Sequence, residues 1–317
     1  IKEIYVENSR ADEYFAWVET IPNSGISYTS KDSISYNSAY NTYIKGDCSA
    51  SISSFEKYNT DYPAGFFRIP AHYYTAICYD NQKQYSTAVT KYKVVADGSD
   101  NEYKPIAIER ISVLYLYLKD TANAFTYYTL LEKYSNDNKS RKKALFGQLI
   151  TAYHLGKFDI AKTKAEQLIK SDQLENDESG EAYNILGKLA LRNINTDKEN
   201  ALRSAKGYFN KTLINHQDLY GAEAKYNVNY IYYMQDSLDK CRKGIMEFNQ
   251  QFSGFKYLLG KSVILFGDLY VKKGDKFNAK ATYNSMLDSQ FPDIALEARR
   301  KIEALEPPKS NLSPSED

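Results

Sequence analysis

Reactive and metal-binding side chains are scarce in this 317-residue chain, which has three cysteines, three histidines and one tryptophan. The cysteines, Cys48, Cys78 and Cys241, form no CxxC pair. We interpret them as small buried hydrophobes, with a Cys48–Cys78 bridge as the alternative. The histidines lie far apart in the sequence, without HxxxH or HExxH spacing, so no metal site is predicted. No Gly-x-Ser-x-Gly elbow occurs either, and we expect a non-enzymatic protein without catalytic residues or a cofactor.

A charge excess of one sign and a long apolar run are also missing. The chain carries 41 basic and 40 acidic residues, and its net charge of +1 gives no field that would attract nucleic acid. The longest apolar run, Ile111–Leu118, is interrupted by Ser112 and is too short to span a bilayer. We therefore expect neither a nucleic-acid partner nor direct insertion of this chain into a membrane.

One segment has some features of a phosphate-binding loop. Gly254 and Gly260 precede a Lys-Ser pair, but five residues separate the glycines where the loop needs four. No strand is expected before this segment. Lys261 and Ser262 are instead expected to begin the first helix of the last repeat. We therefore reject a nucleotide site here.

What the chain does contain is a repeated pattern of small and aromatic residues. The clearest copy runs from Leu265 to Pro292, with Gly267 and Ala279 as small residues, Gly274 at a turn and Tyr283 as the aromatic residue. Small residues let two antiparallel helices approach closely, and the aromatic ring fills the gap between neighbouring pairs. The pattern predicts a helix–turn–helix pair.

The second-helix slot that Tyr283 occupies recurs along the whole chain, and it is not always aromatic. It falls on residues 55, 92, 128, 165, 209, 245 and 283, with successive differences of 37, 36, 37, 44, 36 and 38. The long interval contains the polar stretch 193–200, which we interpret as a lengthened turn. Val18 lies 37 residues before Phe55 and takes the same slot in an incomplete first unit.

These repeats predict an all-α fold, a right-handed α-α superhelix built as a solenoid of antiparallel helix pairs. The expected array covers residues 1–306: a truncated first unit at 1–22, about seven repeats at 33–292 and a C-terminal capping helix at 293–306. A disordered tail is expected at 307–317. We expect the chain to open partway through a first helix, as the C-terminal part of a longer array. The charged residues of the capping helix, Glu297 and Lys301 among them, are expected to face solvent.

The repeat residues resemble tetratricopeptide repeats, whose pattern has Leu-Gly, Tyr, Gly, Ala, Phe, Ala and Pro at fixed offsets. The resemblance covers nearly the whole chain and is best at Leu265–Pro292. Two segments, SFEKYNTDYPAG at 54–65 and AHYYTAICY at 71–79, are similar in style to bacterial envelope repeat proteins. Examples are the Tol–Pal-associated periplasmic coordinator and the outer-membrane barrel-assembly lipoprotein. This resemblance implies a scaffold in the periplasm or cell envelope of a Gram-negative bacterium.

The resemblance also implies that the first helix of each pair lines a concave groove. The offsets that face this groove fall on Tyr36, Tyr40, Tyr43, Tyr73, Phe146, Tyr153, Tyr226, Tyr230 and Tyr233, with His154 beside them. Spacing of i, i+4 and i+7 puts each tyrosine trio on one helix face, and tyrosine suits the recognition of peptides. In the alternative interpretation these rings pack between helices, or the 30 tyrosines reflect AT-rich codons.

Three hypotheses of function follow. The first is a non-enzymatic scaffold that binds a peptide or protein segment in the concave groove, in assembly or maintenance of the bacterial envelope. The alternative is a carbohydrate-binding helical-repeat protein at the outer membrane, since aromatic faces stack on sugar rings. The third is self-association of the chain, through an apolar face around Tyr5, Tyr14 and Trp17.

Overall fold

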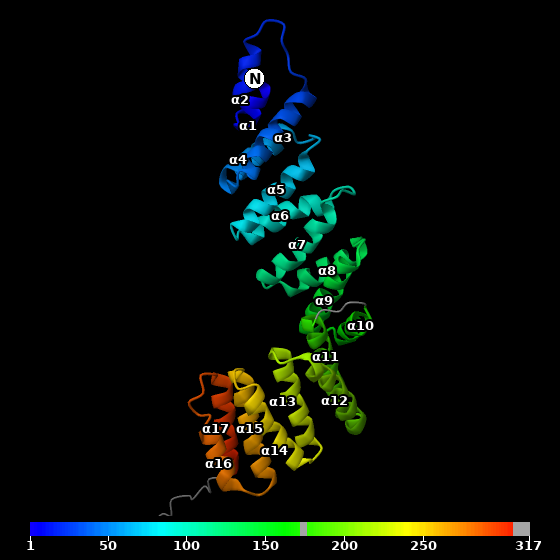
Figure 1. The fold of residues 1–317 in the computed structure, drawn as a ribbon, viewed down its shortest axis with the longest axis vertical. Coiled ribbons are helices and arrows are strands. Elements are labelled where there is room, and N and C mark those ends of the chain that lie inside the picture. The colour runs from blue at the N-terminus through cyan, green and yellow to red at the C-terminus, as the bar shows by residue number, and fades with distance from the viewer. Residues whose placement is uncertain (172–175, 307–317) are drawn as a thin grey trace, which may run out of the picture. The chain divides into compact units, whose positions relative to one another are not determined.

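The computed structural model describes residues 1–171 and 176–306, and every regular element in these residues is an α-helix (Figure 1). The predicted fold class, an all-α solenoid of helix pairs, is confirmed. The predicted disordered tail at 307–317 lies outside the described residues.

The chain folds as two compact units, Ile1–Ala161 and Lys162–Asp317. The first unit contains α1 (Lys2–Glu7), α2 (Ala11–Glu19), α3 (Tyr28–Ile44), α4 (Cys48–Asp61), α5 (Arg68–Asn81), α6 (Tyr85–Asp97), α7 (Lys104–Tyr117), α8 (Thr121–Tyr134) and α9 (Asn138–His154). Helix α10 (Phe158–Leu168) crosses the boundary between the units. The second unit contains α11 (Asn176–Leu191), α12 (Lys198–Asn215), α13 (Leu219–Met234), α14 (Leu238–Gln251), α15 (Lys256–Lys272), α16 (Lys276–Asn284) and α17 (Pro292–Leu305).

The slot predicted from the repeats is a core position in every copy. All eight residues that occupy it, whether aromatic, aliphatic or alanine, are buried: Val18, Phe55, Tyr92, Tyr128, Ala165, Phe209, Ile245 and Tyr283. Burial of a slot that tolerates different apolar side chains is typical of packing between helix pairs. The interpretation of this slot as a packing position is confirmed.

The turns within the helix pairs show the same period independently of side-chain type. A residue with positive φ occurs in seven of these turns, at Ser9, Gly46, Lys83, Lys119, Gly156, Asp236 and Gly274. Each lies nine positions before a packing slot. The remaining pair, α11 and α12, has a longer turn between Leu191 and Lys198, where the lengthened turn was predicted.

Two of these left-handed turn positions hold lysine, which adopts this conformation less readily than glycine. Lys83 has a φ of 60° and Lys119 a φ of 59°. Replacing either lysine with glycine is expected to raise the free energy of unfolding by about 0.5–1 kcal/mol, because glycine has no Cβ that crowds the carbonyl. The denaturant midpoint checks this, with Gly156→Ala, at a φ of 72°, as the control that should be less stable.

Close contacts between glycine and an aromatic ring fix how tightly the helices of a pair approach. A Cβ built on Gly267 would lie 2.2 Å from the Tyr283 ring, and one on Gly187 would lie 2.6 Å from the Phe209 ring. These distances are far below van der Waals contact. Only glycine therefore lets α15 approach α16, and α11 approach α12, as closely as they do.

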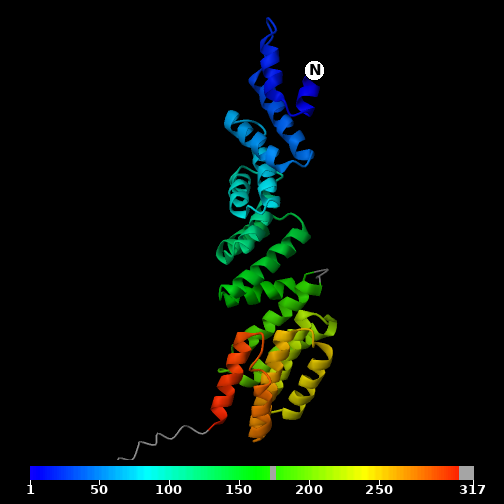
Figure 2. The ribbon, with the colours of Figure 1, turned by 90° about the vertical axis from the view of Figure 1, so that its left-hand side faces the viewer.

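Consecutive first helices form an inner face in the second unit. Helices α11, α13, α15 and α17 contact one another in sequence, whereas within the described residues α12, α14 and α16 make no comparable contact. Both views show α13, α15 and α17 side by side (Figure 2). Ion pairs join these helices: Lys188 with Glu223 at 2.8 Å, and Lys301 with Asp268 at 2.7 Å. The first helices therefore line one continuous face.

The cysteines are free thiols. Cys78 and Cys241 are buried, as expected of small hydrophobes, while Cys48 is half-buried. No cluster of three or more metal-binding side chains occurs in the described part of the chain. Across the same residues, no helix has the length and apolar character needed to cross a membrane.

Candidate binding surfaces on the inner face

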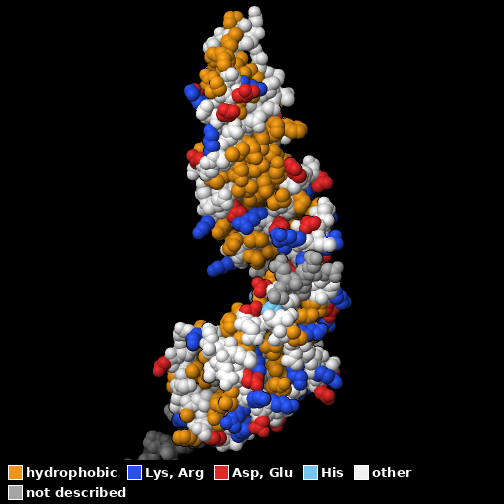
Figure 3. Space-filling model, viewed as in Figure 1, with side chains coloured by type: hydrophobic (Ala, Val, Ile, Leu, Met, Phe, Trp, Pro, Cys, Tyr) orange, Lys and Arg blue, Asp and Glu red, His pale blue; other side chains and the backbone are white. Residues whose placement is uncertain are grey.

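Aromatic rings from α3, α5 and the start of α7 form one connected surface in the first unit. We call it the tyrosine platform; it consists of Tyr36, Tyr40, Tyr43, Phe67, Tyr73, Tyr74 and Tyr103. Tyr74 lies at its centre, with its ring centroid 4.9 Å from that of Tyr40, 4.8 Å from that of Tyr43 and 5.4 Å from that of Tyr73. Hydrophobic side chains gather over α3 and α5 in the space-filling view (Figure 3). Four residues predicted to face the groove thus meet here.

The members of the platform differ in exposure. Tyr36 is buried, with 8% of its surface exposed, and its ring stacks on Phe67 at 4.4 Å. Tyr40, Tyr43 and Tyr73 are half-buried and offer part of their rings to solvent. Tyr36 is therefore a packing residue beneath the platform, as in the alternative interpretation of the tyrosine pattern, and the other three can contact a ligand.

A buried carboxylate holds the loop that carries Phe67. Asp32, which is 3% exposed, accepts hydrogen bonds from the Tyr58 hydroxyl and from the backbone N–H of Phe66 at 2.8 Å. The Tyr58 oxygen in turn accepts from the backbone N–H of Phe67 at 3.1 Å. This network fixes the segment between α4 and α5, and with it the ring that stacks on Tyr36.

Three phenols of the platform, those of Tyr43, Tyr73 and Tyr103, stay protonated at neutral pH. Burial is the main cause that raises the pKa of Tyr43, Tyr73 and Tyr103 above the ordinary value. Neighbouring phenols and thiols raise the pKa further, because each disfavours a second negative charge nearby. These three residues thus give the platform neutral hydroxyl groups beside its ring faces.

Next to Tyr73, on α5, lies a histidine that is expected to make stability pH-dependent. Burial, with Lys91 and Arg68 nearby, lowers the pKa of His72 to about 4, against about 6.5 in an unfolded chain. The unfolded state therefore binds more protons between these values, and stability falls as the pH drops from about 6.5 to 4, by roughly 3 kcal/mol at most. His72→Gln should lose less stability over this range.

Urea midpoints at pH 7 and pH 4 check this expectation. The variant of exposed His154, His154→Gln, is the matched control and should follow the wild type. Equal losses in the wild type and in His72→Gln would show that His72 is not responsible.

The predicted residues on α9 form a separate small group. The ring centroid of Tyr153 lies 6.0 Å from that of His154 and 5.9 Å from that of Phe158. Phe146, two turns earlier in α9, is half-buried. None of them is a member of the platform. Their role in binding stays a prediction.

The second predicted trio lines a cleft in the second unit, which we call the inner cleft. Its volume is about 510 Å³, within the range of ligand sites in proteins. Its lining residues come from α11, α13, α15 and α17: Leu191, Tyr226, Asn227, Tyr230, Tyr233, Lys261, Ile264, Leu265, Asp268, Glu297 and Lys301. The i, i+4, i+7 spacing of the three tyrosines does put them on one surface.

Charges of both signs surround the tyrosines of the inner cleft. Oδ1 of Asp268 accepts hydrogen bonds from Lys301 at 2.7 Å and from the Tyr283 hydroxyl at 2.6 Å, so this carboxylate already pairs with a cation. Lys261 lies over the Tyr226 ring at 4.9 Å from its centroid, in a cation–π contact. In the described residues no carboxylate pairs with Lys261, and no cation pairs with Glu297. The cleft therefore offers one cation and one anion to a ligand.

The phenol of Tyr226 is held neutral in this setting. Burial, and secondly the negative charge of Glu297, raise the pKa of Tyr226 well above the ordinary value. Burial and the carboxylate of Asp268 raise the pKa of Tyr233 in the same direction. Both hydroxyls can therefore donate hydrogen bonds to a ligand at any physiological pH.

The charged residues of the capping helix have a second setting besides the solvent that was expected. Glu297 is exposed, as expected, and Lys301 is half-buried, and both line the inner cleft. The reason is that α17 packs against α15 as a further first helix, so one of its faces continues the inner face.

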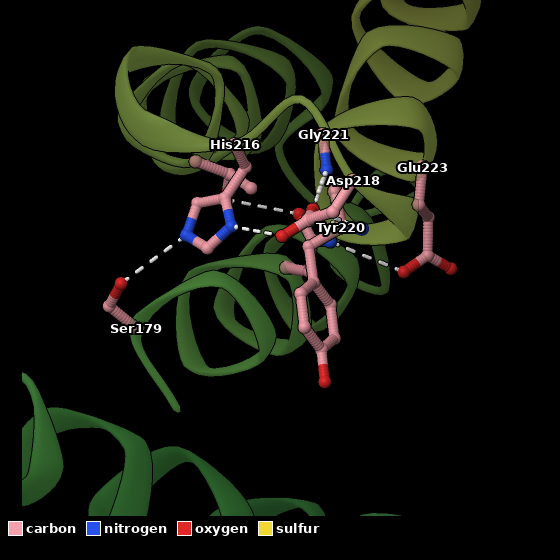
Figure 4. A network of polar contacts seen from close by, with 8 residues as sticks. Ser179, His216, Asp218, Tyr220, Gly221 and Glu223 are labelled. Carbon is pink, nitrogen blue, oxygen red and sulfur yellow. Dashed lines mark hydrogen bonds and ion pairs between the residues drawn. The ribbon is translucent and has the colours of Figure 1, made fainter. Parts of the chain in front are cut away.

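A polar network elsewhere in the second unit has the order of groups of a catalytic triad (Figure 4). The Ser179 hydroxyl lies 3.4 Å from Nε2 of His216, and Nδ1 of His216 lies 2.9 Å from a carboxylate oxygen of Asp218. The other Asp218 oxygen accepts the backbone N–H groups of Tyr220 and Gly221, and so caps α13. The network therefore connects α11, the end of α12 and the start of α13.

Burial argues for a structural role of this network. His216 is only 2% exposed, and a Cβ on Gly180 would lie 2.7 Å from its ring, so no substrate atom can reach Nε2. The backbone N–H groups of Tyr220 and Gly221 already donate to Asp218, so they do not form an oxyanion site. The network stabilises the packing of three helices.

Comparison with known protein families gives one match. Residues 71–97 match the family described as Tetratricopeptide repeat. The match covers α5 from its fourth residue onward and the whole of α6. The match supports the tetratricopeptide repeat superfamily for this pair of helices. No curated protein sequence matches the chain.

Several solved structures are similar to the chain at low identity. A tetratricopeptide repeat protein from Parabacteroides merdae is 13% identical, with 86% of this chain and 98% of that chain covered and a TM-score of 0.47. BtubC from P. vanneervenii is 17% identical, with 74% and 96% covered and a TM-score of 0.49. YrrB, described as a TPR protein with an unusual peptide-binding site, is 18% identical, with 66% and 97% covered and a TM-score of 0.46.

Proposed function

We propose that this array of helix pairs, with a tetratricopeptide repeat at residues 71–97, is a non-enzymatic scaffold that binds a segment of another protein. The inner cleft is the principal contact in this proposal. The observation that carries it is the convergence of Tyr226, Tyr230 and Tyr233 with Lys261 and Glu297 on one cleft.

The chemistry of the inner cleft suits a peptide better than a ligand of one charge. Tyrosine rings supply contact area with little loss of rotamer freedom, and they are enriched at protein interfaces. A peptide carries cationic and anionic side chains together, so it can pair with both Glu297 and Lys261. An open face along successive first helices also suits an extended or helical segment.

Selection of peptides tests this function. A library of random displayed peptides is selected on the wild-type chain, and the dissociation constant of the best peptide is measured by calorimetry. Tyr230→Ala is expected to weaken binding about 30-fold, as truncation of an interface anchor does. Tyr117→Ala, which removes a 58% exposed tyrosine of the first unit, is the control and should bind as the wild type does. Equal affinity for Tyr230→Ala would refute the assignment of the cleft.

The tyrosine platform favours a second candidate, the binding of carbohydrate. Its seven members are all aromatic, and its hydroxyls can bond to sugar oxygens while ring faces stack on the sugar. A glycan array probed with wild type and with Tyr40→Ala tests this: the candidate requires glycans that bind the wild type and lose binding in the variant. An array without hits removes it.

We also propose a place in the bacterial cell envelope, on the strength of the sequence similarity to envelope repeat proteins, with a role in envelope assembly or maintenance. Cell fractionation with an antibody against the native protein tests this location. Recovery in the cytosolic fraction alone would contradict it.

A further inference from the structure

A second cavity of the second unit lies between α14, α15 and the segment that joins α16 to α17. We call it the outer pocket. Its volume is about 550 Å³, and most of its lining is apolar, including Met246, Leu259, Val263, Phe266, Met286 and Phe291. Cavities of this size and character are typical of sites for small organic ligands.

The outer pocket and the inner cleft lie on opposite sides of α15. The pocket is lined by residues 256, 259, 260, 262, 263 and 266 of this helix, and the cleft by residues 261, 264, 265 and 268. At 3.6 residues per turn, the centres of these two sets are about half a turn apart. The outer pocket is therefore no part of the inner face, and an inference about it does not rest on the function proposed above.

A buried hydroxyl in the wall of the outer pocket has no partner. Ser262 is 1% exposed and lines the pocket, and no hydrogen-bond partner of its Oγ is found in the described residues. An unsatisfied buried hydroxyl is destabilising, and proteins seldom keep one without a use. A ligand with one polar atom beside apolar groups would satisfy it. A partner helix that inserted only aliphatic side chains would leave it unsatisfied.

Two methionine side chains, which are flexible, line the outer pocket. The chain has three methionines, and two of them, Met246 and Met286, line this one cavity. Unbranched thioether side chains adapt to ligands of different shapes. Met246 is 54% exposed, so it can move without disturbing the core.

The charges of the outer pocket lie on exposed residues. Lys256 and Asp288, which have opposite signs, are both exposed, and the buried part of the lining carries no ionisable group. Burying a charged ligand against this apolar wall would be unfavourable. The cavity thus favours a ligand without a net charge.

We propose that the outer pocket binds an uncharged, mostly apolar small molecule that has a single hydrogen-bonding group directed at the Ser262 hydroxyl. Phenols with a short alkyl chain are the simplest compounds with this chemistry.

The three methionines allow a direct test. The full chain is labelled with ¹³C at the methionine methyl groups and titrated with 4-butylphenol, and in parallel with butylbenzene, which lacks the hydroxyl. Saturable shifts are expected at Met246 and Met286 but not at Met234, which packs in the Phe209 cluster away from the pocket. The phenol is expected to bind about fivefold more tightly than the hydrocarbon, as one additional hydrogen bond provides.

Two serine variants make the test specific. Ser262→Ala should remove the difference between the two compounds, whereas Ser285→Ala, at an exposed residue that also lines the pocket, should keep it. Because Ser262 has no partner to lose, its alanine variant is expected to fold and to have a raised melting temperature. Three results would overturn the proposal: no saturable shift at Met246 and Met286, equal shifts at Met234, or the same preference for the phenol in Ser262→Ala as in the wild type.

Discussion

Gly267→Ala is expected to destabilise the second unit by about 3 kcal/mol, although alanine favours helix formation over glycine by about 1 kcal/mol. The added Cβ would lie 2.2 Å from the Tyr283 ring. That ring is fully buried, and its hydroxyl is bonded to Asp268, so it cannot move aside without breaking the hydrogen bond. The approach of α16 to α15 must therefore loosen.

Gly207→Ala is the matched control for this expectation. Gly207 lies within α12, and no atom lies within 4 Å of the position of an added Cβ. Here the substitution should stabilise the unit by about 0.5–1 kcal/mol. Opposite signs of the two shifts in denaturant midpoint support close packing at Gly267. Stabilisation in both variants would show that the helices do not approach as closely as described.

Asp32→Ala is expected to destabilise the first unit by about 3 kcal/mol. The substitution removes the carboxylate that accepts from the N–H of Phe66 and from the hydroxyl of Tyr58, and the Tyr58 side chain is buried away from water. The loop between α4 and α5 then loses its anchor, and the stacking of Phe67 on Tyr36 loosens with it. The near-UV circular dichroism of the tyrosines should fall even where the far-UV signal is retained.

Asp100→Ala serves as the comparison for Asp32→Ala. Asp100 is exposed, in the loop before α7, and its removal should change the free energy of unfolding by no more than about 0.5 kcal/mol. Similar losses in both variants would mean that the Asp32 network does not hold the platform.

The fold could be predicted from the sequence because its strongest signal is periodic. Seven of the eight packing slots combine a small or apolar residue with a turn nine positions earlier, and all eight are buried in the same way. The long turn between Leu191 and Lys198 was also visible, as the one interval that breaks the period.

The candidate surfaces could be predicted only in part. The tyrosines on α3 and α13 share a helix face, which spacing alone determines. Phe67 and Tyr103, in contrast, lie at the starts of α5 and α7, where the connections between pairs vary in length and follow no period. Glu297 and Lys301 line the inner cleft because α17 packs against α15 as another first helix. The many charged residues of this segment indicate only a solvent-facing helix, so the sequence does not predict that packing.

In the proposed function, a protein segment binds on the inner face, at the inner cleft that α11, α13, α15 and α17 line. The most direct measurement is cross-linking of the selected peptide, made with a photoreactive group at each position in turn, followed by mass spectrometry of the cross-linked residues. We expect cross-links to α13, α15 and α17 around Tyr230, and we expect them to be lost in Tyr230→Ala. Cross-links confined to α14 and α16, or to the first unit, would contradict it.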